Sequence, residues 1–299
     1  MRRRLFLHVG LPKTGTSAVQ AWLYRNADAL RRSEMEYPDA FAPGGDPSHR
    51  WLVRGLLSRD LADLRAVLDA ASQPDIVLSS EGLTNHLYDF SPEALDMFRS
   101  MTGAFDVTVL LATREMDAWL RSYYRQAIIN PGNRMSDLWG TALSFEDFAR
   151  HPRMRQLADH PALINDLRAA YGASHLVRLD YDGDWFSGLA GALGIDCAAS
   201  APADRVNESV PGWIAALMLR INRLGKSEPE RRLWRAAIQM HCPTGNSVFR
   251  QSLAGIRRPD IAALDRSIVE REVRERVHAG RGDIDGLLGF SDFLKEQSP

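Results

Sequence analysis

Residues 8–17 read HVGLPKTGTS, and this stretch decides the fold. It follows a short apolar run at residues 5–7 and precedes residues 18–30, whose pattern is typical of a helix. Gly10 and Gly15 have the G-x-x-x-x-G spacing of a loop that binds phosphate between a strand and a helix. Glycines let the backbone approach an anion closely, and the N-terminus of the following helix favours negative charge.

The position of the lysine in this loop is unusual. A nucleoside-triphosphate loop carries Lys directly after its second glycine, where this chain has Thr16, while Ser17 stands at the usual Ser/Thr position. The lysine of the stretch, Lys13, lies in the middle of the loop instead. The loop therefore indicates a phosphorylated ligand other than a nucleoside triphosphate.

Composition excludes several classes of protein. Of the 299 residues, 45% are hydrophobic and 25% are charged, and the formal net charge is −1. That balance argues against nucleic acid as the main partner. No apolar run approaches the ~18–20 residues of a membrane span. Cys197 and Cys242 have no metal-ligand spacing and form no disulfide framework, so we expect a cytoplasmic protein with reduced thiols.

Continuous apolar runs alternate with helical periodicity through the first two thirds of the chain. Four runs predict strands, at residues 5–9, 76–80, 107–112 and, more weakly, 175–179. This order predicts an α/β fold, a three-layer sandwich with a central parallel sheet. Beyond residue 200 the pattern turns helical. We expect one domain over residues 1–299, with an α/β core at about 1–200 and a mainly helical extension at about 201–299.

The segment PKTGTS, within HVGLPKTGTSAVQAWL, resembles the 5′-phosphosulfate loop of sulfotransferases that use 3′-phosphoadenosine 5′-phosphosulfate (PAPS). The wider stretch is similar to bacterial members related to carbohydrate sulfotransferases. The resemblance implies a P-loop-type fold, PAPS as co-substrate and no required metal. It implies that Lys13 contacts the bridging oxygen of the donor and that the loop binds the 5′-phosphate, with binding residues Pro12, Lys13, Thr14, Gly15, Thr16 and Ser17.

A second segment supports the resemblance. The family's 3′-phosphate site has an Arg at a strand end and a Ser eight positions later, and Arg114 and Ser122 match that spacing. Arginine suits a terminal phosphate because its planar fork donates two parallel hydrogen bonds. Glu115-Met116 departs from the Asn-Pro that many relatives carry after the arginine, which concerns turn geometry more than charge.

A third segment has two readings. Arg205-Val206-Asn207-Glu208-Ser209 resembles the R-x-N-x-S segment of bacterial relatives, in which Arg205 adds a cation at the 3′-phosphate. The same residues are equally suited to cap a helix that starts near Pro211.

Transfer to a hydroxyl needs a group that accepts its proton. Glu81 directly follows the strand at 76–80, and ligands of open parallel sheets bind beyond the carboxyl ends of strands. We therefore expect Glu81 to be the base, with His86 as the alternative. His8, inside the first strand, is expected to be a structural histidine. His49, in a Pro-Gly-rich loop, is expected to be exposed or to contact the acceptor.

These features together favour a PAPS-dependent sulfotransferase that transfers a sulfuryl group in line to a hydroxyl of a carbohydrate or small molecule. The alternatives are a P-loop kinase, which would need Mg²⁺ and the missing lysine, and a non-catalytic nucleotide-binding protein. A basic stretch reads as a solvated helix face or a site for an anionic or sugar acceptor; it comprises Arg220, Arg223, Lys226, Arg231, Arg232 and Arg235.

Overall fold

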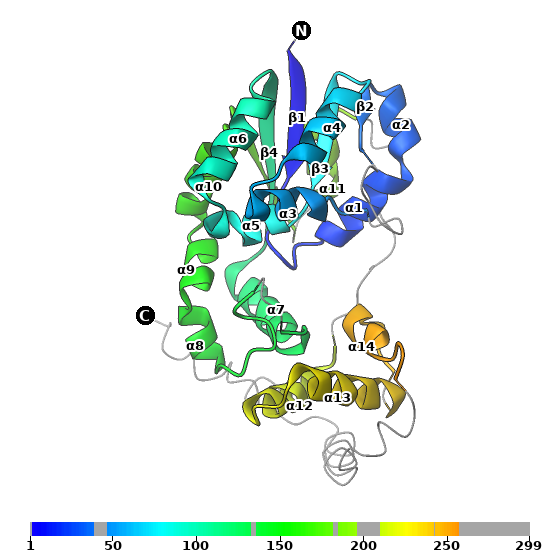
Figure 1. The fold of residues 1–299 in the computed structure, drawn as a ribbon, viewed down its shortest axis with the longest axis vertical. Helices are drawn as coiled ribbons and strands as arrows, with labels where there is room; N and C mark the ends of the chain where they lie inside the picture. The colour runs from blue at the N-terminus through cyan, green and yellow to red at the C-terminus, as the bar shows by residue number, and fades with distance from the viewer. Residues whose placement is uncertain are drawn as a thin grey trace. The chain divides into compact units, whose positions relative to one another are not determined.

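The structure divides into two compact units (Figure 1). The first contains residues 1–119 and 155–206, and the second residues 120–154 and 207–299. This computed structural model describes residues 2–38, 47–132, 136–181, 185–195, 210–241 and 243–256.

The first unit is built on a five-stranded, all-parallel sheet in the order β2-β3-β1-β4-β5. The strands are β1 (Arg3–His8), β2 (Met35–Glu36), β3 (Asp75–Ser79), β4 (Phe105–Thr113) and β5 (His175–Asp180). The predicted α/β class, the parallel sheet and its four main strands are confirmed. The edge strand β2 was not predicted, because two residues are too short to produce a recognisable apolar run.

Helices cover both faces of this sheet (Figure 1). On one face, α1, α2 and α11 pack against Phe6, Val77, Leu110 and Leu179. Residues that alternate with these, such as Leu7, are fully buried on the opposite face, where α10 packs on β4 and β5 and contacts α6. The helices of this unit are α1 (Thr16–Arg25), α2 (Ala27–Arg32), α3 (Arg50–Ser58), α4 (Ala62–Ala70), α5 (Gly82–Asn85), η1 (Leu87–Asp89), α6 (Pro92–Thr102), α10 (His160–Tyr171) and α11 (Trp185–Leu193).

The strand register brings four chain segments to one edge of the sheet. His8 at the end of β1 pairs with Ser79 at the end of β3, and Thr113 at the end of β4 pairs with Asp180 at the end of β5. The segments that follow these strands therefore all start at the carboxyl edge, where ligands of open parallel sheets bind.

The second unit is helical. Its helices are α8 (Phe145–Arg150), α12 (Gly212–Arg223), α13 (Glu228–His241) and α14 (Ser247–Ser252). Two further helices cross the boundary between the units, namely α7 (Met116–Ile129) and α9 (Pro152–Ala158). None of the helices in the described ranges is long and apolar enough to cross a membrane.

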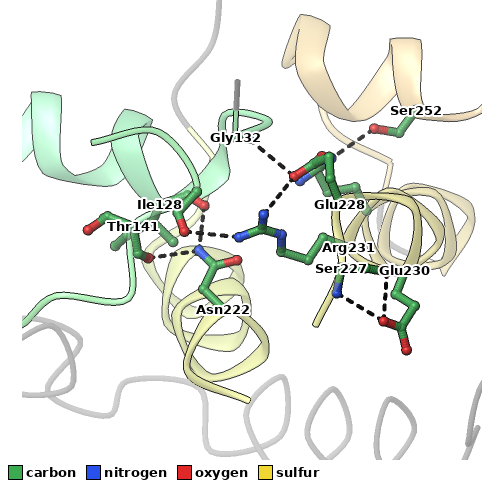
Figure 2. A network of polar contacts seen from close by, with 11 residues as sticks. Ile128, Gly132, Thr141, Asn222, Ser227, Glu228, Glu230, Arg231 and Ser252 are labelled. Atoms are coloured by element: carbon green, nitrogen blue, oxygen red, sulfur yellow. Dashed lines mark hydrogen bonds and ion pairs between the residues drawn. The ribbon is translucent and has the colours of Figure 1, made fainter. Parts of the chain in front are cut away.

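Polar contacts tie α12 to the last turn of α7 and to the loop that follows it (Figure 2). The Asn222 side chain is buried, and its Nδ2 donates to the carbonyl oxygens of Ile128 and Thr141, both at 2.9 Å. One amide thereby satisfies the backbone of two separate segments. Backbone groups that leave regular structure need such partners when they are buried.

Helix α13 carries a partly buried ion cluster (Figure 2). Glu228 accepts from Arg231 Nη2 at 3.1 Å and from the Gly132 amide at 3.1 Å, and it pairs with Arg235 through its other oxygen. Arg235 is only 1% exposed. Burial lowers the pKa of this guanidinium, while Glu228 opposes that effect. The expectation that the basic stretch is a solvated face is wrong at Arg235. Glu228, seven residues earlier on the same face of α13, pairs with the guanidinium and so allows its burial.

Candidate functional site

The loop after β1 continues the sheet before it turns. The amides of Val9 and Leu11 donate to Leu110 and Ala112 of β4, at 3.0 and 2.9 Å, so the chain stays extended beyond His8. A buried hydrogen bond then fixes the turn. Trp119 Nε1 donates to the Pro12 carbonyl at 2.8 Å. The loop is therefore held by the neighbouring strand and by the start of α7.

Two residues of the loop have left-handed backbone conformations. Lys13 has φ 69° and Gly15 has φ 75°. Glycine adopts such angles freely, but a residue with a Cβ does so at a cost of about 1–3 kcal/mol that often marks a functional site. The loop therefore keeps a lysine at its centre although a glycine there would avoid the backbone strain.

Helix α1 begins directly after Gly15 with an open first turn. Gly15 is its N-cap residue, no side chain caps the helix, and no acidic residue lies in the first turn. Thr16 is buried in this turn and Ser17 is exposed. The hydroxyl of Thr14 is used within the loop, since it donates to the Leu11 carbonyl at 2.5 Å. An uncapped N-terminus with exposed hydroxyl is suited to an anion.

Lys13 and Arg114 form a cationic pair at the carboxyl edge. Both side chains are half-buried, and Arg114 directly follows β4. Burial lowers the pKa of the Lys13 ammonium, and the charge of Arg114 lowers it further. Lys13 makes no ion pair within the described ranges. Two like charges held near each other favour the binding of an anionic ligand at this edge of the sheet.

Tyr181 completes this cluster and was not predicted. It follows β5, and its amide donates to the Thr113 carbonyl at 2.8 Å. The Arg114 guanidinium carbon lies 5.2 Å from the centre of the tyrosine ring, within range of a cation–π contact. A Cβ added at Gly15 would lie 2.7 Å from the ring, so the tyrosine packs directly on the loop. The carboxyl-edge rule that selected Glu81 applies equally to Tyr181 and could have found it.

Glu81 lies two residues beyond the end of β3, at the start of α5. Its carboxylate is half-buried and accepts a hydrogen bond from Gln20 Nε2 on α1 at 3.0 Å. Gln20 was also not predicted. Its sequence signal is a polar residue at a position of α1 that otherwise reads as apolar, next to Val19 and Leu23.

The alternative base, His86, ends α5 and pairs with Asp89 Oδ2 through Nδ1 at 2.8 Å. His8 is fully buried, and its Nδ1 lies 2.7 Å from the Ser79 hydroxyl. Burial lowers the pKa of His8 to about 4, which keeps the imidazole neutral at physiological pH. This agrees with a structural role.

The expectation for His49 is wrong. The side chain is 3% exposed, its Nδ1 accepts from the Ser79 amide at 2.8 Å, and its Nε2 donates to the Pro38 carbonyl at 2.6 Å. These two bonds fix a neutral imidazole in the core. The Pro- and Gly-rich composition of the residues before His49 did not predict this burial, because it indicates a loop but not the environment of the residue that follows.

Two further predicted residues lie outside the described part of the first unit. Ser122 lies on α7 in the second unit, and Arg205 lies outside the described residues. Their assignment to a 3′-phosphate site stays a prediction. No group of three or more potential metal ligands occurs in the part of the chain that the structure describes.

The chain was compared with protein-family models and with curated proteins, and neither comparison finds a match. We therefore infer the function from the residues themselves and from their arrangement at the carboxyl edge of the sheet.

Proposed function

We propose that this protein is a sulfotransferase that moves a sulfuryl group from PAPS to a hydroxyl of a carbohydrate or small molecule. The observation that carries the proposal is the Lys13–Arg114 pair, two half-buried cations on the segments that follow adjacent strands. A donor with a phosphosulfate at one end and a 3′-phosphate at the other supplies anions for both. The resemblance of PKTGTS to the family's loop gives the same roles.

In this proposal the loop and α1 bind the 5′ end of the donor. The uncapped N-terminus of α1, with Thr16 and Ser17, binds the 5′-phosphate. Lys13 binds the oxygen that bridges sulfur and phosphorus. Arg114 binds the 3′-phosphate, together with Ser122 and Arg205 as the resemblance implies. Tyr181 holds the plane of the Arg114 guanidinium from one side.

The reaction needs no further reactant. The acceptor oxygen attacks sulfur in line while its proton passes to the Glu81 carboxylate. The bond between sulfur and the bridging oxygen breaks, and its electron pair stays on the 5′-phosphate, where Lys13 compensates the developing charge. The products are the sulfate ester and adenosine 3′,5′-bisphosphate. Thr16 stands where a kinase would carry its phosphate-binding lysine, which disfavours ATP as the donor.

The donor is tested by titrating the protein with adenosine 3′,5′-bisphosphate and, separately, with ATP in the presence and absence of Mg²⁺. We expect the bisphosphate to bind more tightly than ATP under both conditions. Arg114→Ala should weaken bisphosphate binding by roughly 10- to 100-fold, the value of a lost charge-assisted pair.

Arg25→Ala is the matched control, because Arg25 is exposed at the far end of α1 and, among the residues that the structure describes, bonds only to the backbone of its own helix. This variant should bind the bisphosphate like the wild type. Tighter binding of Mg²⁺-ATP than of the bisphosphate would overturn the proposal in favour of a kinase. Bisphosphate binding without transfer to any hydroxyl in a broad panel would favour a non-catalytic binding protein.

A further inference from the structure

Gln20 connects the helix that begins at the phosphate loop with the expected base. It lies on α1, and its Nε2 donates to Glu81 Oε2 at 3.0 Å across 61 positions of sequence. Gln20 is 3% exposed. No other hydrogen bond to the Glu81 side chain occurs among the described residues, so the second carboxylate oxygen keeps its accepting capacity.

The position of Gln20 is costly unless the side chain has a partner. Its neighbours on α1, Val19 and Leu23, are buried apolar residues of the core. An amide in such a place is stabilising only when it is hydrogen-bonded, and leucine would fill the same space without that requirement. The buried glutamine therefore has a role that packing alone does not explain.

One face of α1 carries a residue of the expected donor site and a residue that contacts the expected base. Thr16 and Gln20 are separated by four residues, one helical turn, and both side chains are buried. Thr16 belongs to the turn that would bind the 5′-phosphate, and Gln20 holds the carboxylate that would take the acceptor proton. One rigid helix thus relates the donor loop and the base.

We propose that Gln20 is a positioning residue that orients the Glu81 carboxylate toward the acceptor hydroxyl. This inference rests on the proposed function. Gln20 occupies Oε2 and fixes the rotamer of Glu81, so that Oε1 receives the proton as the new oxygen–sulfur bond forms. Gln20 itself transfers no proton.

The experiment measures sulfuryl transfer from PAPS as a function of pH for Gln20→Met, which fills similar space without a donor. We expect kcat to fall roughly tenfold, a fraction of the ~10²–10⁴ that a general base contributes. The affinity for adenosine 3′,5′-bisphosphate should stay within about twofold of the wild type, because Gln20 bonds to Glu81 and lies one helical turn beyond the residues expected to bind the donor. The acid limb of the kcat profile should move to higher pH, since the carboxylate has lost a donor.

A second variant separates orientation from folding. Gln20→Glu keeps the size and polarity of the side chain but places a second carboxyl group beside Glu81, so the acid limb should move further upward than in Gln20→Met. Leu23→Met is the matched control for a changed core side chain on α1 and should keep both kcat and the profile. Thermal unfolding of each variant verifies that it is folded.

The outcomes distinguish this inference from the proposed function. If Glu81→Gln abolishes transfer while Gln20→Met and Gln20→Glu keep the wild-type kcat and acid limb, the positioning role is overturned and the function stands. If Glu81→Gln keeps the wild-type kcat, Glu81 is not the base and the role of Gln20 falls with it. Failure to bind the bisphosphate overturns the proposed function itself.

Discussion

Two pairs of buried or half-buried cations lie in the two units of this protein, and they differ in how their charge is compensated. In the second unit, Arg231 and Arg235 share the carboxylate of Glu228. In the first unit, Lys13 lies near Arg114 and makes no ion pair within the described ranges, and the pKa of its ammonium is lowered. The arginine pair of the second unit therefore has a structural role, whereas the Lys13–Arg114 pair of the first unit is suited to binding a ligand.

Positive charge thus has two different roles in this protein. A buried cation that serves stability brings its own counter-charge, because leaving it alone costs several kcal/mol. A cation that binds a ligand has a charged form that is disfavoured by burial and by neighbouring cations until the anionic ligand is bound. We therefore expect the removal of a charged group to have opposite consequences for stability in the two units.

The largest effect is expected at Lys13. Lys13→Ala should lower the rate of bisphosphate release from PAPS by ~10²–10³, the typical loss of one preorganised group at a developing charge. Its stability against urea should equal or exceed that of the wild type, because the variant loses a desolvated charge beside Arg114. Both Lys and Ala carry a Cβ, so the strain at φ 69° is unchanged. Turnover near that of the wild type would show that Lys13 has no part in the reaction.

Glu228→Gln tests the opposite case. The variant leaves two guanidinium groups without their carboxylate, and we expect the free energy of unfolding to fall by about 3 kcal/mol, measured by urea denaturation. Glu230→Gln is its control on the same helix, because Glu230 is an exposed carboxylate that contacts Lys226 and Ser227. The control should unfold near the wild-type midpoint. Equal midpoints for the two variants would contradict the structural role of the Glu228 cluster.

The smallest effect is a pH dependence of bisphosphate affinity. Free Lys13 has a pKa below the ordinary 10.5, and bound phosphates should raise it. Between these two values binding takes up a proton, so affinity should fall as pH rises through the lowered pKa, by up to tenfold per unit of difference. Calorimetry over this alkaline range should show the fall in the wild type and none in Lys13→Met.

The same shift predicts the sign of a stability change in the absence of ligand. The unfolded chain, with an ordinary lysine pKa, binds more protons than the folded protein in the window between the lowered value and 10.5. Stability should therefore rise with pH through that window, relative to Lys13→Met. A fall in the same window would mean that Lys13 is stabilised by a negative partner.

The sequence predicted the parts of the fold that depend on local pattern. The runs at 76–80 and 107–112 are mainly apolar because their strands are buried on both faces, and this pattern predicted β3 and β4 as strands of a parallel sheet. Once the strands are parallel, their carboxyl ends meet at one edge. Lys13, Glu81 and Arg114 therefore could be assigned to one region from the sequence alone.

The sequence did not predict contacts that depend on distant packing. The Gln20–Glu81 bond joins residues 61 positions apart, and no local pattern announces it. Arg235 reads as one of several cations, and only the fold shows that Glu228 allows its burial. The boundary between the units falls inside α7, where helical periodicity continues without a break.

The contact between Gly15 and Tyr181 has an evolutionary consequence. The ring occupies the space into which a side chain at position 15 would grow, with Cε2 2.7 Å from an added Cβ. A lineage that replaced this glycine would first have to lose the aromatic residue at position 181, and with it the ring beside Arg114. Positions 15 and 181 should therefore change together among descendants of this chain, although they lie 166 positions apart.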